Sequence, residues 1–344
     1  MIPIQNIYYM LSYAFQVLNE QGYKNIATEQ FHNTAELMAA ILEKGIAIQL
    51  KRGLGKEYIP QTEALSSLRG KIDIAESIKT QSMLRKQLIC TYDEFSVNSI
   101  MNQIIKSTVE LLLRSNISKQ RKKNLRKLMV YFSEVDFIDS YTVNWNVQYN
   151  RNNQTYRMLI SICYLVVKGL LQTQSNGHTK LMDFLDEQRM CRLYEKFILE
   201  YYRKEFKNQI TANASQIPWQ LDNEENSMLS VMQSDIMLQS GEKVLIIDAK
   251  YYEHSTQVQF DKHTLHSGNL YQIFTYVKNK EYELREKDHT VSGMLLYAKT
   301  DEEIYPNNVY QMSGNQIAVR TLDLNLPFDE IASQLNTIAK THFD

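Results

Sequence analysis

The first half of the chain has apolar residues spaced three and four positions apart, which is the spacing of an amphipathic helix. This spacing occurs in residues 4–18, 34–48 and 100–113, and the segment from Trp145 to Leu171 has the same character. Four helices are therefore predicted. Glycine and proline cluster in residues 49–74, where short alternating stretches predict a few strands inserted among the helices.

The second half follows a different order. The polar stretch QTQSNGHTK, at residues 172–180, breaks the helical pattern and is the predicted linker. Beyond it we predict a helix, two strands joined by a turn at Gly241, a second helix and a buried strand, at residues 183–206, 228–238, 243–252, 268–280 and 291–298. This order is typical of an α/β fold in which the last strand joins the sheet as a parallel neighbour.

The two patterns together predict an α/β protein, α+β overall, with a change of character near residue 176. Residues 1–176 are expected to form a mainly helical domain with some strands, and residues 177–344 a domain built on a sheet. The length agrees, because 344 residues correspond to roughly two domains of about 150 residues.

Composition narrows the class of protein. The chain is 44% hydrophobic and 22% charged, with 38 Lys and Arg against 39 Asp and Glu. These values exclude a disordered or collagen-like chain. Because positive and negative charges nearly cancel, any binding of nucleic acid must come from local patches of basic residues. The longest apolar run, residues 158–167, is far shorter than the roughly twenty residues that cross a bilayer, and the amino terminus does not resemble a signal peptide. We expect a cytoplasmic protein that has no membrane contact.

Three cysteines, Cys90, Cys163 and Cys191, lie far apart and form no CxxC pair. We therefore expect neither a disulfide framework nor a structural zinc site. Each is interpreted as a small apolar residue of the interior in a reducing compartment.

The strand KVLIIDAKYY carries a carboxylate and an amine near its end. Because side chains alternate along a strand, Asp248 and Lys250 share one face and Ala249 lies on the other. Burying such charges is unfavourable unless the groups are paired or bind a ligand. A salt bridge between Asp248 and Lys250 explains these two residues as well as a ligand does.

A second carboxylate, Asp235, lies in the preceding strand. If the two strands form a hairpin about Gly241, Asp235 and Asp248 are symmetrically placed and can face each other. Two carboxylates that close repel unless a divalent cation lies between them, and their oxygens suit Mg²⁺ or Mn²⁺. Such a metal polarises a phosphodiester and activates water, and the nearby lysine can orient the nucleophile or stabilise charge on the phosphorus.

The two helices of the second half add three candidates. Glu195, in LYEKFILEYY, can bind the metal directly or through water, although a lone helical glutamate is more often solvated surface. Gln272 and Tyr276, in NLYQIFTYVK, lie four residues apart and share a helix face, a spacing that is also common by chance.

The combination is much less common than its parts. The order Glu, Asp, Asp-x-Lys and Gln-x-x-x-Tyr over helix, strand, strand and helix resembles the PD-(D/E)XK nuclease superfamily, across roughly residues 181–300. The whole chain resembles a narrower family, the McrC nuclease subunits of McrBC modification-dependent restriction systems. That resemblance rests on stretches in both halves: IPIQNIYYMLSYAF, LRGKIDI, YDEFSVNSIMNQIIK, LYEKFILEYY and IIDAKYY. It implies a restriction-endonuclease-like αβββαβ domain in residues 177–344.

The resemblance also implies a role for each candidate residue. Asp235 and Asp248 become metal ligands, with Glu195 as an auxiliary acidic ligand and the carbonyl of Ala249 beside them. Lys250 becomes the catalytic lysine next to the attacking water. The expected reaction is hydrolysis of a DNA phosphodiester with Mg²⁺ as cofactor and Mn²⁺ as a substitute.

Gln272 and Tyr276 complete the catalytic set that the resemblance implies, by shaping the site and its approach to DNA. One departure is that Ser234 stands where the superfamily motif has proline, a position that supplies no chemistry. Some relatives with the Gln-x-x-x-Tyr element hold an iron–sulfur cluster with four cysteines. Three scattered cysteines cannot do so, and no cluster is expected.

A partner follows from the same resemblance. In McrBC systems a separate AAA+ subunit, McrB, recognises DNA with methylated or hydroxymethylated cytosine and hydrolyses GTP as a hexameric ring. The McrC subunit docks on that ring through its amino-terminal half, enters the central pore and stimulates GTP hydrolysis. The present chain has no GxxxxGK[ST] motif, so we expect it to bind no nucleotide itself.

Two features of the first half have alternative interpretations. Residues 114–127, RSNISKQRKKNLRK, contain seven basic residues and no acidic one, which fits a solvated surface or contact with DNA phosphates. The apolar and aromatic residues of the opening stretch fit either a core helix or an interface with the partner: Ile4, Ile7, Tyr8, Tyr9, Leu11 and Phe15.

The expected function is therefore a DNA endonuclease subunit of a GTP-dependent restriction complex that acts in defence against foreign DNA. Two alternatives remain. The chain could be an adaptor and GTPase activator with a vestigial nuclease site, or a stand-alone PD-(D/E)XK nuclease. The complete set of Asp, Asp and Lys disfavours the first, and the absence of a DNA-reading or motor motif disfavours the second.

Overall fold

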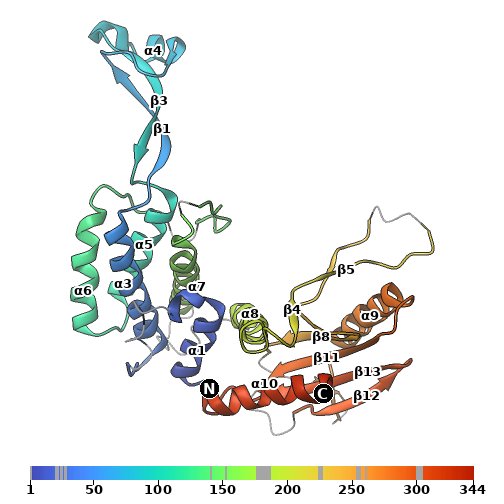
Figure 1. The fold of residues 1–344 in the computed structure, drawn as a ribbon. Helices are drawn as coiled ribbons and strands as arrows, with labels where there is room; N and C mark the ends of the chain where they lie inside the picture. The colour runs from blue at the N-terminus through green and yellow to red at the C-terminus, as the bar shows by residue number, and fades with distance from the viewer. Residues whose placement is uncertain are drawn as a thin grey trace. The chain divides into compact units, whose positions relative to one another are not determined.

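The computed structural model describes residues 2–19, 23, 26, 29–139, 142–151, 153–175, 187–223, 228–252, 257–259, 262–299 and 305–344. The chain forms two compact units (Figure 1). One unit combines Met1–Phe31 with Leu185–Asp344, and the other is His32–Phe184. The mixed α/β class predicted from the sequence is confirmed.

Four helices form the body of the His32–Phe184 unit: α3 (Thr34–Arg52), α5 (Ile100–Arg114), α6 (Lys119–Met129) and α7 (Tyr156–Ser175). The side chain of Asn33 accepts a hydrogen bond from the backbone of Glu36, which caps α3 at its start. Gly53, at φ 90, ends the same helix. The three predicted helices of this unit are confirmed as α3, α5 and α7, which pack on one another. A short 3-10 turn, η3 (Val130–Phe132), follows α6.

A small antiparallel sheet leads away from these helices (Figure 1). Its strands are β1 (Glu57–Leu65), β2 (Lys71–Asp73) and β3 (Leu88–Ser96), in the order β1-β3-β2, so the strands predicted near residues 49–74 are confirmed. The short helix α4 (Ile74–Lys79) and the 3-10 turn η2 (Ser82–Arg85) connect β2 to β3. Residues 57–96 are called the finger below. Large apolar side chains are exposed along it: Tyr58, Leu68, Ile74, Ile78, Met83, Leu84 and Phe95.

The other unit is built on a six-stranded sheet with the order β12-β13-β11-β8-β7-β4. Its central strand, β8 (Lys243–Lys250), pairs antiparallel with β7 (Ile236–Ser240) through the turn at Gly241. On its other side β8 pairs parallel with β11 (Thr290–Ala298), which confirms the predicted parallel neighbour. Both strands are buried along nearly their whole length, because helices cover the sheet.

Three outer strands of this sheet were not predicted from the sequence. They are the edge strands β4 (Thr211–Asn213) and β12 (Asn308–Met312), and β13 (Asn315–Leu322), which lies between β12 and β11. Two small ladders accompany the sheet, one of β5 (Gln216–Ile217) with β6 (Met232–Gln233) and one of β9 (Gln257–Gln259) with β10 (Lys262–Thr264).

Helix α9 (Ser267–Leu284) packs closely on one face of the sheet. A Cβ atom added at Gly293 of β11 would lie 2.8 Å from side-chain carbons of Ile273 and Val277, so glycine allows this approach. Helix α8 (Glu187–Glu205) contacts β4, β7 and β8, and α10 (Phe328–Phe343) contacts β13. The predicted helices at residues 183–206 and 268–280 are α8, described from Glu187, and α9.

The amino-terminal helix α1 (Ile4–Ala14) belongs to the sheet-containing unit, followed by the 3-10 turn η1 (Gln16–Asn19). The ring of Tyr13 lies 5.7 Å from that of Phe197 on α8, and the ring of Tyr9 stacks at 4.4 Å on Phe328 of α10. The Nδ2 of Asn6 donates to two backbone carbonyls just before α10. The predicted division at residue 176 is therefore corrected, because aromatic packing places the first 31 residues with the second half.

The structure also bears on the opening helix, the predicted linker and the cysteines. Ile7, Tyr8 and Leu11 are buried, so the opening helix is a core helix, as its spacing indicated. The predicted linker at residues 172–180 begins within α7, and its part from residue 176 onward lies outside the described residues. Cys90 and Cys163 are buried, and all three cysteines are free. No helix in the described ranges is long and apolar enough to cross a membrane.

Candidate active site

Asp235 and Asp248 lie side by side at the open end of the β7–β8 hairpin. The last pair of the ladder is Ile236 with Ile247, so Asp235, one residue before β7, is the neighbour of Asp248. The Oδ2 of Asp235 accepts a hydrogen bond of 3.0 Å from the backbone N–H of Ala249. The juxtaposition predicted from the symmetry about Gly241 is thus confirmed.

A break in the strand orients Asp235. We predicted one strand over residues 228–238, but β6 and β7 are separate, with Ser234 and Asp235 between them. Ser234 is buried, and both its backbone N–H and its hydroxyl donate to the carbonyl of Ser215. These bonds draw β6 toward β5 and away from the main sheet, which leaves Asp235 at the point where the chain changes partner.

Lys250 links the carboxylates to helix α9. Its Nζ lies 2.8 Å from Oδ2 of Asp248, in an ion pair whose side chains are only 14% and 2% exposed. The same Nζ donates to Oε1 of Gln272 at 3.3 Å, and Nε2 of Gln272 donates to the hydroxyl of Tyr276 at 2.9 Å. The Gln-x-x-x-Tyr pair therefore does meet the Asp-x-Lys pair, which sequence spacing alone left open.

Glu195 approaches the same cluster from α8. Its Oε1 lies 3.1 Å from the thiol of Cys191, one helical turn earlier, and that thiol is 3.9 Å from the carbonyl of Ala249. Cys191 was not among the predicted site residues. Its spacing of four from Glu195 would have been the signal, because residues so spaced share a helix face.

Burial and repulsion dominate the electrostatics of the cluster. Burial, then the charges of Asp248 and Glu195, raise the pKa of Asp235 to about 8. Burial also raises the pKa of Glu195, against the attraction of Lys250. For Lys250 itself burial works to lower the pKa, but the adjacent Asp248 outweighs it, so the pKa is raised and the side chain is a cation at neutral pH.

The donor set fits a hard divalent cation in part. Two carboxylates lie together, and Oδ2 of the buried Asp248 has no hydrogen bond within the described residues besides its ion pair with Lys250. A cation between Asp235 and Asp248 would remove their repulsion. Across the described ranges, however, no group of three or more His, Cys, Asp or Glu side chains is arranged to hold a metal. Glu195 is therefore not in place as a third direct ligand, and Mg²⁺ would keep several waters, as it commonly does.

Two further features surround the cluster. Asn269 donates to the hydroxyl of Tyr297 at 2.9 Å and lies 3.3 Å from that of Tyr252, so a polar network supports the strand end that carries Lys250. A groove of about 330 Å³ runs beside Gln272 and Tyr276. A larger cavity of about 390 Å³, beneath α10, has none of the candidate catalytic residues in its lining.

Comparison with known proteins decides the family. The family described as "McrBC 5-methylcytosine restriction system component" matches residues 5–298 of this chain, which spans both units. The chain belongs to this McrBC family. The chain is also 29% identical, over 342 residues, to the Type IV methyl-directed restriction enzyme EcoKMcrBC of Escherichia coli (strain K12). That alignment covers 97% of this chain and 96% of the relative.

Two solved structures of McrBC proteins are similar to this chain at lower identity. One is a half-complex from a tetradecameric assembly of Thermococcus gammatolerans McrB AAA+ hexamers with bound McrC; it is 17% identical, with a TM-score of 0.49, over 98% of this chain and 76% of that chain. The other is the Thermococcus gammatolerans McrBC complex, 20% identical with a TM-score of 0.42, over 59% of each chain.

Proposed function

We propose that this member of the McrBC family is the DNA endonuclease subunit of its restriction system. One observation carries the proposal: Asp235 and Asp248 face each other across a hairpin, with Lys250 beside them on the face covered by α9. A buried excess of negative charge is unfavourable for folding, and a site that hydrolyses phosphodiesters with a metal requires such a set.

Asp235 and Asp248 would hold Mg²⁺, or Mn²⁺ in its place, with the carbonyl of Ala249 and waters completing the coordination. When bound, the cation would polarise the scissile phosphodiester and make an attacking water more acidic. Glu195, held by Cys191 at the edge of the cluster, would act through water. Burial raises its pKa, so its carboxyl group holds a proton more readily than an exposed glutamate does.

Lys250 would act as a fixed positive charge. Because its pKa is raised by Asp248, it remains protonated and does not serve as a base. Gln272 holds its Nζ, and Tyr276 in turn holds the amide of Gln272. This chain of contacts orients the ammonium group toward the carboxylates, where it would stabilise negative charge that develops on the phosphate.

The proposed partner is an AAA+ GTPase hexamer like McrB, and the proposed substrate is double-stranded DNA with methylated or hydroxymethylated cytosine. The family match and the relative's name, a methyl-directed restriction enzyme, support this assignment. We propose the finger as the docking element. Its exposed apolar side chains, such as Leu84 at 82% and Ile78 at 63%, form a surface that soluble proteins usually bury against a partner.

The function is tested by cleavage of methylated and unmethylated plasmid by this chain together with the NTPase encoded beside it, with Mg²⁺ and GTP. We expect cleavage of the methylated plasmid alone, and only when GTP is present. Cleavage without the partner would instead favour a stand-alone nuclease.

The variant Asp248→Ala separates the nuclease from the adaptor role. It removes one of the two carboxylates, so cleavage should fall to background, while partner docking and stimulated GTP hydrolysis should persist. If the wild-type protein stimulates GTP hydrolysis but never cleaves, the nuclease site is vestigial and the chain is an adaptor. Loss of GTPase stimulation in a folded Asp248→Ala protein would contradict the separation of roles.

A further inference from the structure

Helix α6 carries an unusual concentration of positive charge. Residues 114–127 contain seven Lys and Arg and no acidic residue, in a chain whose net charge is −1. Ser118 caps the helix, and Leu125 is its buried contact with the rest of the unit. Six of the seven basic residues lie on this one short helix, and Arg114 ends the preceding helix α5.

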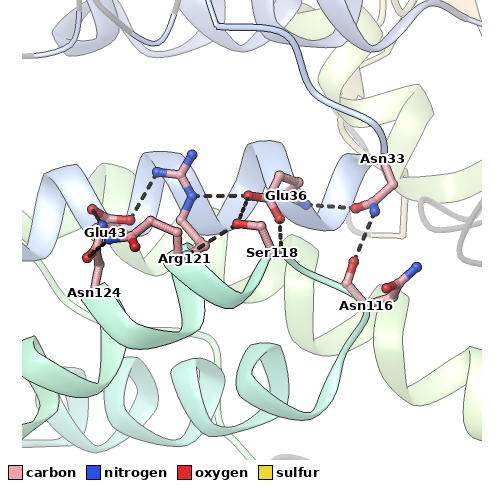
Figure 2. A network of polar contacts seen from close by, with 8 residues as sticks. Asn33, Glu36, Glu43, Asn116, Ser118, Arg121 and Asn124 are labelled. Carbon is pink, nitrogen blue, oxygen red and sulfur yellow. Dashed lines mark hydrogen bonds and ion pairs between the residues drawn. The ribbon is translucent and has the colours of Figure 1, made fainter.

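A buried polar clamp uses one of these cations to fasten α6 to α3 (Figure 2). Arg121 lies 3.4 Å from Glu36 and 3.0 Å from Glu43, and all three side chains are at most 22% exposed. The backbone N–H and hydroxyl of Ser118 donate to Glu36, and Asn124 donates to Glu43. The clamp holds the helix with a defined face toward solvent.

Within the part of the chain that the structure describes, the remaining cations of α6 make no ion pair. Arg114, at the end of α5, pairs with Glu110. Five basic residues remain, and no side-chain ion pair, hydrogen bond or ring contact within the described ranges involves them. Lys122 is half-buried and the other four are exposed: Lys119, Lys123, Arg126 and Lys127.

This arrangement is unfavourable for the helix itself. Lys119 and Lys123 are four residues apart, as are Lys123 and Lys127, and like charges at that spacing destabilise a helix. Lys119 also lies in the first turn, where the helix dipole disfavours a cation. A helix whose exposed lysines repel one another, but which a buried clamp holds in place, is typical of a binding site.

We propose that the exposed face of α6 binds the phosphate backbone of double-stranded DNA, independently of sequence. The face extends about 12 Å from Lys119 to Lys127, at about 1.5 Å per residue, which spans several phosphates of one strand. The charges have no exposed apolar side chain between them, and the exposed Val130 and Tyr131 lie past the end of the face, in η3. A charged centre fits a polyanion better than a protein partner, whose interface would have an apolar centre. The inference rests on the proposed function, because it assigns a second DNA contact to a DNA endonuclease.

The test compares two double variants that remove equal charge. Lys123→Gln with Lys127→Gln neutralises the proposed surface. The matched control, Lys207→Gln with Lys340→Gln, neutralises two exposed lysines that likewise have no partner within the described residues. The full-length protein is titrated into a fluorescent 30-base-pair unmethylated duplex in EDTA, and anisotropy is measured over a range of salt concentrations.

We expect the α6 variant to bind the duplex about tenfold or more weakly at 0.1 M salt, and to reduce the slope of log affinity against log salt by about 1.8, which corresponds to two phosphate contacts. The control should stay within about twofold of wild type. Thermal unfolding serves as the folding check, because relief of repulsion on α6 should leave the melting temperature unchanged or raised.

Equal losses in both variants, or unchanged binding in the α6 variant, would overturn the inference. Unchanged DNA binding with weakened stimulation of the partner GTPase would show that α6 contacts the partner protein instead. The result is distinguishable from a failure of the proposed function, because binding in EDTA involves no cleavage: a wild-type protein that never cleaves would contradict the proposed function and still allow the α6 variant to be compared with its control.

Discussion

Asp235 and Asp248 place two carboxyl groups at a position where water is largely excluded. Burial and mutual repulsion act in the same direction on Asp235, and its pKa is raised to about 8. The folded protein therefore stores an unfavourable interaction at the site, which a bound cation would relieve. At the residue scale this conflict between stability and proposed function is directly testable.

Replacing Asp235 by Asn should stabilise the metal-free protein and abolish cleavage. The amide oxygen can still accept the hydrogen bond from Ala249. An amide also takes up no proton on folding, whereas Asp235, with its pKa of about 8, must do so at pH 7. In EDTA at pH 7 the free energy of unfolding should rise by about 2 kcal/mol, since one pKa unit corresponds to about 1.4 kcal/mol and part of the shift is lost to relaxation. The measurement is urea unfolding with and without Mg²⁺.

Mg²⁺ should stabilise the wild-type protein but not Asp235→Asn. If Mg²⁺ stabilised both proteins equally, Asp235 would not be a ligand, and the proposed metal site would be wrong.

His342 gives the protein a pH dependence that is independent of the proposed metal. Burial lowers its pKa below 6.5, with the charge of Lys243 acting in the same direction, and its Nε2 has no hydrogen bond within the described residues. A group whose pKa is lowered on folding contributes stability above its unfolded pKa, and this contribution is lost as the pH falls. His342 should therefore cost stability as the pH falls from 7.5 to 5.5, whereas Asp235, with its raised pKa, acts in the opposite direction over the same range.

The variant His342→Phe should remove that cost, so that its melting temperature changes more favourably than that of wild type between pH 7.5 and pH 5.5. His32→Gln, at an exposed histidine, is the control and should behave as wild type. A variant that retained the full pH dependence would show that other groups cause it.

At the scale of elements, the contact between α3 and α6 depends on buried ion pairs. Arg121 neutralises Glu36 and Glu43 together, in a region where each side chain is largely removed from water (Figure 2). Loss of one partner from such a set leaves uncompensated charge, which destabilises more than the intact pair stabilises.

Arg121→Ala should accordingly reduce the free energy of unfolding by about 3 kcal/mol or more, because two buried carboxylates lose their cation. The control is Arg114→Ala, whose pair with Glu110 is solvent-exposed and worth less than about 1 kcal/mol. Urea unfolding of both variants decides the matter. Similar values for the two would mean that the clamp is not a stabilising element.

At the scale of the whole molecule, the finger belongs to one compact unit and the sheet that carries the candidate active site belongs to the other. The finger exposes apolar side chains at its helical tip, which costs solubility unless a partner covers them. If docking on the partner and cleavage of DNA belong to different units, a substitution in one unit should abolish one activity and leave the other intact.

The double variant Met83→Ser with Leu84→Ser should weaken binding of the partner ring by about tenfold or more, since exposed apolar anchors commonly carry interface energy. Because both side chains are exposed, the free energy of unfolding should change by less than about 0.5 kcal/mol. The control is the equivalent pair at another site, Met228→Ser with Leu229→Ser. Equal weakening by both variants would exclude the finger as the specific docking element.

Much of the site could be predicted from the sequence because its geometry is local. The period of two along β8 places Asp248 and Lys250 on one face, and symmetry about Gly241 places Asp235 opposite Asp248. The spacing of four likewise places Gln272 and Tyr276 together on α9. Six helices, α1, α3, α5, α7, α8 and α9, and the central strands follow from the same short-range patterns, whereas α6 and α10 were not predicted.

Only the tertiary structure decided what distant segments do to one another. Aromatic rings of α1 pack on Phe197 of α8 and Phe328 of α10, which are far away in the sequence. The first 31 residues therefore belong to the unit that contains the sheet. The hydrogen bond from Lys250 to Gln272 and the pairing of Glu36 with Arg121 depend in the same way on packing. The sequence thus determined which groups could share a face, whereas folding decided which faces meet and how deeply their charges are buried, because only packing removes water.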